Sequence, residues 1–435
     1  MFKVLSSVWA LLLGIVLIML GNGMHSTLIG VRGGIENFSS AELAIVTSAY
    51  FAGFLSGARL TPVMLRRVGH VRVFAALGSF MSAALIAFPL LTEPWAWTPL
   101  RILVGFCMSG IYVTAESWLN DAATNETRGK VLSAYMIAQT LGIIGAQGLL
   151  TLGDAATSVL FIGASILVSV SFAPILLSVS SVPVTEAAKA MPLRELFVEA
   201  PLSTVGIFLL GSVYATQSGM GAVFGTKIDL TTAQIALFIG MLFAGALLFQ
   251  YPIGWLSDRM DRRKLIFGAA LMGGISCALG WMAGDQLWPL MAAAFFAGGM
   301  TTPLYALFLA YTNDFLTLEE MPAASGALVL TFGIGAISGP LVTGWAMQQF
   351  GPYAFWLVLV VTFGAIALYA LYRMTKREAM PADETESYLG VLPTASPMAV
   401  ETAGVWAAEQ AEAEAEVEAE SETETETEKE DPARP

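Results

Sequence analysis

The chain has 435 residues, of which 56% are hydrophobic and only 13% are charged. An ordinary soluble protein is about half apolar and about a quarter charged, so the composition excludes an ordinary soluble domain and indicates an integral membrane protein. The net charge of -13 comes entirely from residues 374–435, which hold seventeen acidic and four basic residues. The acidity is therefore a property of the C-terminal end and not of the apolar body.

A helix needs about 20 predominantly apolar residues to cross a bilayer, and twelve segments meet this requirement. They are Val8 to Leu28, Leu43 to Leu65, Val71 to Leu91, Pro99 to Leu119, Val131 to Thr151, Val159 to Val179, Leu202 to Phe224, Ala233 to Leu256, Leu265 to Gly284, Trp288 to Tyr311, Ala323 to Trp345 and Tyr353 to Tyr372. The first is too long for a signal peptide and lacks a cleavage pattern, so we expect it to be retained. The predicted fold class is an all-α integral membrane protein with 12 transmembrane helices.

The placement of Lys and Arg predicts the orientation, because short cytoplasmic loops retain basic residues. With the N-terminus inside, the opposite side of the membrane keeps only Arg32 and Lys227. Since the number of spans is even, we expect both termini to be cytoplasmic.

The spans fall into two groups of six. We expect an N-terminal six-helix bundle at 1–180, a cytoplasmic linker at 181–200, a C-terminal six-helix bundle at 201–373 and a disordered acidic cytoplasmic tail at 374–435. Residues 411–430 alternate acidic and small residues with almost no apolar bulk, which cannot offset the entropy cost of ordering. A solvated tail is the simplest interpretation, and a basic partner or a regulatory role stays open.

Two landmarks recur with nearly the same period. A short charged loop between apolar spans occurs at residues 62–72 and again at 254–263, offset by 192 residues. Tyr112 and Asn120-Asp121 match Tyr305 and Asn313-Asp314, offset by 193 residues. A duplicated membrane unit of this kind is the architecture of secondary transporters.

The second loop carries a recognisable pattern. Its residues Gly254, Leu256, Ser257, Asp258, Arg259, Arg262 and Arg263 resemble the Gly-x-Leu-x-Asp-Arg-x-Gly-Arg-Arg signature of the major facilitator superfamily (MFS). Asp261 departs from the expected Gly, and in the first loop Arg66 stands in the position of the acid. Together with Ala115-Glu116-Ser117 and Asn313-Asp314, the chain resembles the YcaD-like bacterial branch over residues 5–375. The resemblance implies the MFS fold of two pseudo-symmetric six-helix bundles in the bacterial inner membrane, the plasma membrane.

The resemblance also implies that Asp258, Arg259 and Arg262 act in gating, by forming ion pairs with the other bundle in one conformation and releasing them in another. The alternative is that these loop charges only set the topology.

Glu116 is the only acid inside a predicted span, and intramembrane carboxylates are costly and usually functional. We expect it near the cytoplasmic end of its helix, close to Arg59 and to Arg66 and Arg67. It can be half of a gating ion pair, a proton carrier or an interfacial acid without a special role.

In this superfamily the first, fourth, seventh and tenth helices line the central cavity. The candidate cavity residues on them are Asn22, His25, Arg101, Tyr112, Tyr214, Gln217 and Tyr305. His25 and Arg101 should lie at similar depth near the outer end, and two bases without a local acid can attract an anionic substrate. Alternatively, Arg101 extends to the interface and satisfies backbone carbonyls.

We expect a secondary transporter of small organic solutes that works by alternating access, with proton-coupled efflux as the first hypothesis. The alternatives are a facilitator or importer of a small organic anion, and a membrane sensor without transport activity. The chain has no phosphate-binding Gly-x-x-x-x-Gly-Lys loop, and His25 and His70 are predicted on opposite sides of the membrane, so an enzyme is not expected. We expect no cofactor and no metal site; the partners are the substrate, protons and the lipid bilayer, with no nucleic acid, and the chain should be a monomer.

Overall fold

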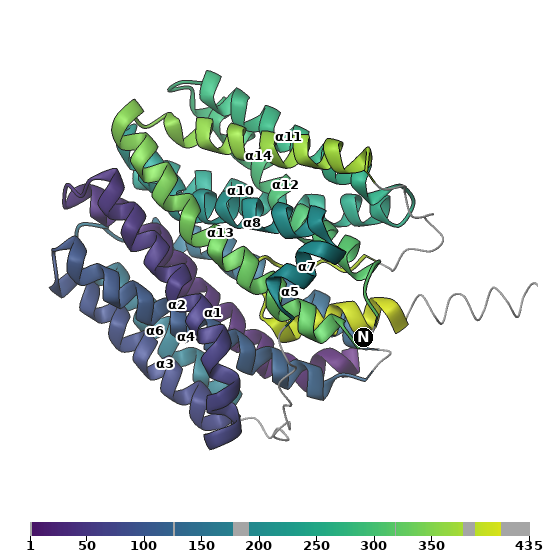
Figure 1. The fold of residues 1–435 in the computed structure, drawn as a ribbon. Coiled ribbons are helices and arrows are strands. Elements are labelled where there is room, and N and C mark those ends of the chain that lie inside the picture. Colours follow the sequence, from purple (N-terminus) through teal and green to yellow (C-terminus); the bar gives the residue numbers. More distant parts are fainter. Residues whose placement is uncertain (1, 125–126, 177–190, 318, 377–387, 410–435) are drawn as a thin grey trace, which may run out of the picture.

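The computed structural model describes residues 2–124, 127–176, 191–317, 319–376 and 388–409, and this part of the chain is helical with no strand. The first half contains α1 (Phe2–Ile35), α2 (Ser40–Val68), α3 (His70–Ala87), η1 (Phe88–Leu90), α4 (Pro94–Ala122), α5 (Arg128–Leu150) and α6 (Val159–Leu176). The second half contains α7 (Leu193–Glu199), α8 (Pro201–Ala215), η2 (Thr216–Met220), α9 (Gly221–Lys227), α10 (Thr232–Ser257), α11 (Arg262–Met282), α12 (Leu287–Asn313), α13 (Met321–Phe350) and α14 (Ala354–Met374). Figure 1 shows the two halves as two groups of helices lying against each other.

The two halves pack by the same scheme. In the first half α2 packs on α4, α1 on α5 and α6, and α3 on α4 and α6; in the second half α10 packs on α12, α8 on α13 and α14, and α11 on α12 and α14. Each pair in one half has its counterpart in the other, which confirms the two pseudo-symmetric six-helix bundles predicted from the repeated loops.

The structure adds a third landmark with the same period. Ser39 caps α2 by accepting a hydrogen bond from the backbone N–H of Glu42, whose carboxylate accepts one from the N–H of Ser39. Thr231 and Gln234 form the same reciprocal capping box at the start of α10, 192 residues later. The helix starts are therefore repeated together with the loops.

Close helix packing is repeated as well. A Cβ at Gly53 on α2 would collide with the carbonyl oxygen of Ile102 on α4, and one at Gly245 on α10 would collide with that of Phe295 on α12. Small residues allow backbones to approach closely where lipid supplies no hydrophobic driving force. The glycines therefore set the distance between equivalent helices in the two bundles.

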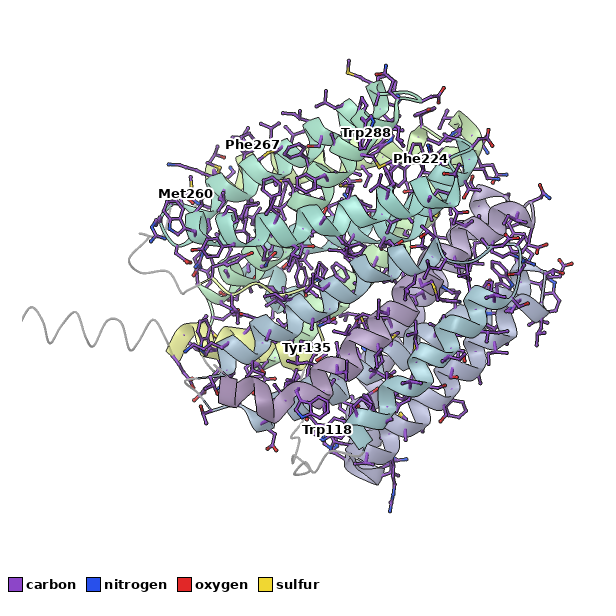
Figure 2. The ribbon with its side chains drawn as sticks, turned by 180° about the vertical axis from the view of Figure 1, so that it is seen from behind. Trp118, Tyr135, Phe224, Met260, Phe267 and Trp288 are labelled. Carbon is purple, nitrogen blue, oxygen red and sulfur yellow. The ribbon has the colours of Figure 1, made fainter. Side chains whose placement is uncertain are left out.

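In the described part of the chain, eleven helical stretches are long and apolar enough to cross a membrane, with α3 and η1 counted as one stretch and α8, η2 and α9 as another. The sixth predicted span is α6, whose apolar part Val159–Pro174 is shorter and adjoins residues outside the described part. Many large apolar side chains lie on the outer surface, such as Trp288, which is 71% exposed and is labelled in Figure 2. Tyr135, also labelled there, is fully buried between the helices. Such a surface suits contact with lipid chains.

The bundles meet directly at the side where α1 ends, which we call the far side. There the ammonium of Lys227 donates to the carbonyl of Phe38 at 3.1 Å, and the hydroxyl of Ser48 donates to the carbonyl of Ile337 at 2.8 Å. Along this line α2 packs against α13. The side at which α1 begins is called the terminal side.

On the terminal side, residues 388–409, called here the terminal segment, lie between the bundles. Residues 397–409 are helical, and Val391, Ala395, Ala399 and Ala403 are buried (Figure 1, yellow). The expectation of a disordered tail from residue 374 is therefore wrong for this segment, because its apolar side chains find partners between the bundles. The low-complexity stretch 411–430 lies outside the described residues.

The predicted linker is described only from residue 191. Met191 donates its backbone N–H to Ala323 at the start of α13, and α7 follows with Leu196 fully buried. This part of the linker is thus folded against the second bundle.

Candidate functional site

A small central cavity of about 70 Å³ lies where α1, α2, α4, α5, α8, η2 and α10 meet. Four of the residues predicted for the cavity line it: Asn22, Arg101, Tyr112 and Tyr214. Tyr50 and Gln147 add polar surface, and Thr394 of the terminal segment closes one side. The sequence prediction placed no C-terminal residue here.

Arg101 is the charged residue of this cavity and is only 4% exposed. Its guanidinium lies 4.7 Å from the centre of the Tyr50 ring, and one terminal nitrogen is 3.3 Å from Nδ1 of His25. His25 is buried behind it, and the centres of its ring and of the Phe88 ring lie 4.6 Å apart in a T-shaped arrangement. The structure thus brings Arg101 and His25 together, and within the described residues no carboxylate is paired with Arg101.

Several buried polar atoms around the cavity have no hydrogen-bond partner in the part of the chain that the structure describes. They are Asn22 Oδ1, His25 Nε2, Arg101 Nε, Ser109 Oγ and Gln217 Nε2. Unsatisfied buried donors and acceptors are costly unless water or a ligand pairs with them. Donors dominate this set, which suits a ligand that presents acceptor oxygens.

Gln217 reaches the same region from a local break in the seventh span. The π-helical turn η2 interrupts the span between α8 and α9, and such turns occur frequently at functional sites. Gln217 accepts a hydrogen bond from Thr301 on α12 at 2.9 Å, and both line a second cavity next to the first. Tyr305 differs from the expectation: it is fully buried against Phe332 and lies outside the residues that line these two cavities.

Glu116 on α4 is 3% exposed and lies deeper than the bundle surface. Its carboxylate accepts hydrogen bonds from the hydroxyl of Tyr135 on α5 and from the backbone N–H of Ser396, both at 3.0 Å. Both donors are neutral. Glu116 is therefore a buried carboxylate without a paired cation among the described residues.

The predicted pairing of Glu116 with Arg59, Arg66 or Arg67 is absent from the described structure. The three arginines are exposed on α2, whereas Glu116 faces α5 and the terminal segment. Hydropathy placed these residues at the same membrane depth, but the rotation of α4 turns the carboxylate into the bundle and away from them.

The three charges of the signature loop have separate partners. Asp258 accepts a hydrogen bond from the backbone N–H of Tyr388 at 2.9 Å, and the Arg259 guanidinium lies 4.4 Å from the centre of the Trp255 ring. Arg262 forms an ion pair with Asp314 in which each side chain is 2% exposed. Asp314 belongs to the Asn-Asp pair that is repeated in the two halves of the sequence, but only the fold shows that it pairs with Arg262.

Asp261, which replaces the expected Gly of the signature, caps α11. Its carboxylate accepts from the backbone N–H of Arg263 at 3.0 Å and pairs with the Arg263 guanidinium at 2.9 Å. Burial by itself raises the pKa of Asp261, but the bonds from Arg263 outweigh it and hold the pKa below its ordinary value. The departure from the signature therefore has a local structural role.

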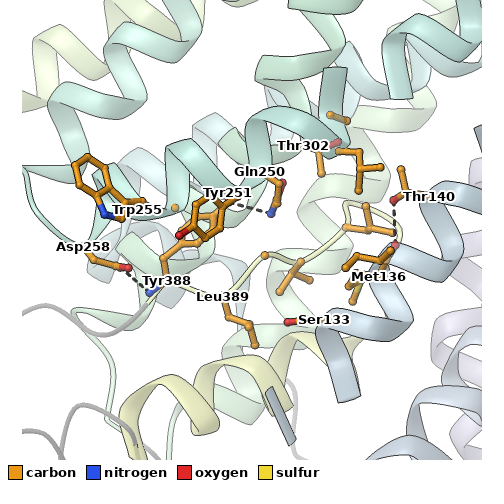
Figure 3. A pocket seen from close by; sticks show the side chains of 17 residues that line it. Ser133, Met136, Thr140, Gln250, Tyr251, Trp255, Asp258, Thr302, Tyr388 and Leu389 are labelled. Atoms are coloured by element: carbon orange, nitrogen blue, oxygen red, sulfur yellow. Dashed lines mark hydrogen bonds between the residues drawn. The ribbon is translucent and has the colours of Figure 1, made fainter. Parts of the chain in front are cut away.

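A larger cavity of about 530 Å³ opens between α5 and α10 (Figure 3). Met136 and Thr140 line it from α5, Gln250 and Trp255 line it from α10, and residues 388–392 form its wall on the terminal side. Tyr251 at its mouth is 80% exposed, so the cavity reaches the outer surface between the two bundles. No cluster of metal-binding side chains occurs among the described residues.

Comparison with known proteins agrees with this architecture. The chain is 24% identical over 382 residues to the MFS-type transporter YcaD of Escherichia fergusonii, covering 86% of this chain and 97% of that protein. It is also 24% identical over 373 residues to an MFS-type transporter of Enterobacter sp. (strain 638), covering 85% and 96%.

Solved structures share the fold. The nucleoside transporter NupG superimposes with a TM-score of 0.67 at 15% identity, covering 84% of this chain and 98% of that one. A bacterial homologue of the human lysosomal transporter Spinster, solved in an inward-facing and unoccupied conformation, gives a TM-score of 0.62 at 14% identity, covering 91% and 97%. The sequence model of the Major Facilitator Superfamily matches residues 11–244 and 202–406, which together span most of the chain. The protein therefore belongs to the Major Facilitator Superfamily and is a multi-pass membrane transporter of small molecules, not an enzyme.

Proposed function

We propose that this transporter moves a small organic anion by alternating access and that a proton bound at Glu116 couples the movement to the proton gradient. The observation that carries the proposal is the position of Arg101, a buried cation in the central cavity with no carboxylate paired to it among the described residues. Charged groups inside a membrane are costly and mark substrate or ion pathways.

The surroundings of Arg101 supply recognition in addition to charge. An arginine stays protonated in proteins and can donate several hydrogen bonds in a fixed plane. The Tyr50 ring covers one face of the Arg101 guanidinium. The Arg101 Nε–H has no hydrogen-bond partner among the described residues, so it can donate a hydrogen bond to a ligand. A carboxylate or phosphate on the substrate, completed by hydrogen bonds from neighbouring amide and hydroxyl groups, fits this arrangement.

Glu116 supports proton coupling because its partners are a hydroxyl and a backbone N–H, so its carboxyl can gain or lose a proton without breaking an ion pair. It lies on α4, the helix that also carries Arg101. Proton binding and substrate binding can therefore act on one helix. We keep export as the proposed direction.

The terminal side is proposed to be cytoplasmic, in the inner membrane of a bacterium. Arg66, Arg67, Arg72 and Lys264 lie at helix ends on that side, whereas Arg32 and Lys227 lie on the far side. Both six-helix bundles, the two bodies that alternating access moves against each other, belong to one chain, so we propose a monomer as the working unit.

A thermal-shift screen tests the substrate class. Purified protein and the Arg101→Gln variant are heated with matched pairs of anionic and neutral small organic solutes, since a ligand that binds the folded state raises its stability. Anionic solutes should shift the unfolding temperature of the wild-type protein and give no shift in the variant. Equal shifts for both proteins, or shifts by the neutral members alone, would overturn the assignment of Arg101.

A further inference from the structure

We infer that the terminal segment, residues 388–409, is a built-in plug that closes the transport pathway from the terminal side and must leave its place before the bundles can move. The inference rests on the proposed alternating-access function but not on the identity of the substrate or the coupling ion. It is carried by the contacts that the segment makes with both bundles and by the depth that it reaches.

The start of the segment is bound to the second bundle. Tyr388 donates its backbone N–H to Asp258, and its hydroxyl accepts from the side-chain amide of Gln250 at 2.9 Å (Figure 3). Its ring lies against Gly254, where a Cβ would come within 2.6 Å of a ring carbon. Burial raises the pKa of the Tyr388 phenol, which stays neutral. Two of its contacts, Gly254 and Asp258, are the first and central residues of the signature loop.

The end of the segment is bound to the first bundle. The indole of Trp406 covers Gly129 at the start of α5, where a Cβ would lie 2.6 Å from the ring. Thr402 donates to the side chain of Asn120 at 3.5 Å, and Glu409 pairs with Arg128 at 3.8 Å. The helical part thus sits against the ends of α4 and α5.

Both members of the repeated asparagine pair touch this helix. Asn120 accepts from Thr402, and Asn313, its counterpart in the second bundle, lies so close to Gly404 that a Cβ there would be 2.7 Å from the Asn313 amide nitrogen. The helix is therefore held between equivalent points of the two bundles. Any rocking that separates these points must break contacts on one side of it.

The middle of the segment reaches the centre of the molecule. Thr394 lines the same cavity as Arg101 and Tyr112, and the backbone N–H of Ser396 binds the carboxylate of Glu116. Thr394 and Ser396 are both buried. The segment consequently occupies space that a solute arriving from the terminal side would need, and it binds the proposed proton carrier.

The sequence of the segment suits a reversible contact. It is apolar enough to be buried at Val391, Val400 and Ala403, yet it makes few charged contacts, and its ion pair with Arg128 is partly exposed. Exposed ion pairs contribute little to stability because water and salt screen them.

Cysteine labelling tests the plug without a substrate. Ser218 lines both small central cavities, so Ser218→Cys reports whether a water-soluble maleimide can reach them. The reagent is applied to the full chain, to a chain ending at residue 409 and to a chain ending at residue 387, all reconstituted in lipid nanodiscs. The native Cys107 and Cys277 are buried within helices, and the chain without Ser218→Cys measures their background.

We expect slow labelling of the full chain and of the chain ending at 409, and labelling at least about tenfold faster in the chain ending at 387. A tenfold change corresponds to about 1.4 kcal/mol of docking free energy. A synthetic peptide with the sequence of residues 388–409 should restore slow labelling. Equal rates in all three chains, or no effect of the peptide, would refute the plug.

A full-length variant covers the case in which the shortened chain does not fold. Gly404→Leu places a side chain against Asn313 and Met321 and should displace the helix, so labelling should again accelerate. Ala substitution of Glu409, whose ion pair is partly exposed, is the matched control and should change the rate less than about threefold. Slow labelling of a folded Gly404→Leu protein would also contradict the inference.

Discussion

The carboxylate of Asp258 accepts a hydrogen bond from the backbone N–H of Tyr388, 130 residues further along the chain. The acid of the signature loop therefore holds the terminal segment in this conformation, and among the described residues it forms no ion pair with an arginine of the other bundle. Because the same loop also packs Gly254 against Tyr388, loop and segment are positioned to act as one element.

Asp258→Ala should loosen the terminal segment. Asp258 is exposed, so the lost hydrogen bond is worth about 1 kcal/mol and labelling of Ser218→Cys should accelerate roughly fivefold or less. Asp285→Ala is the control, since Asp285 follows α11 on the far side and bonds to Tyr353. Faster labelling in the control, or unchanged labelling in Asp258→Ala, would show that Asp258 does not hold the terminal segment in place.

Removing one partner of the Arg262–Asp314 pair should destabilise the second bundle strongly. Both side chains are 2% exposed, and an isolated buried charge costs about 3–5 kcal/mol. Arg262→Met and Asp314→Leu should each lower the unfolding temperature of the purified protein, and the double variant should be more stable than either single variant. If the double variant is the least stable of the three, the prediction is wrong, and each charge stabilises the fold by more than neutralising the other.

The fold was predictable because its signals are periodic and local. Long apolar runs mark the spans, and the repeat of the loops at 62–72 and 254–263 predicts the two bundles. The positions of Asn22, Arg101 and Tyr112 in one cavity followed from their helices and depth. The position of Tyr305 did not, since helix rotation turned it toward Phe332.

The terminal segment was missed for a physical reason. Its apolar residues, such as Val391, Val400 and Trp406, are too few and too interrupted to resemble a span, and an acidic stretch follows them. Large apolar residues are nevertheless more frequent in 388–409 than in 411–430, and this difference in composition was the signal that could have predicted a folded segment. The partners of Glu116 depended on the same segment, so a carboxylate predicted to pair with arginines instead binds Ser396.

Glu116→Gln should uncouple transport from protons. The amide keeps an oxygen that can accept from Tyr135 and Ser396 but cannot carry a proton, so substrate exchange should persist while accumulation driven by a pH gradient falls at least about tenfold. The assay uses proteoliposomes and the anionic solute with the largest thermal shift. Tyr135→Phe removes a donor but keeps the carboxyl and should remain coupled; gradient-driven accumulation by Glu116→Gln would exclude Glu116 as the carrier.

Glu401→Gln should tighten the terminal segment. Burial raises the pKa of the Glu401 carboxyl, so the docked state binds more protons than the released state. Docking is therefore strongest below the ordinary pKa and weakens as pH rises through the raised pKa, because burial disfavours the charged carboxylate in the docked segment. Labelling of Ser218→Cys should slow about twofold or more in the neutral variant. Glu116, which binds Ser396, titrates in both chains, so the comparison is between them: mild acidification should slow labelling, relative to a free thiol, more in the parent chain than in the variant. Faster labelling of Glu401→Gln would show that the charge supports docking.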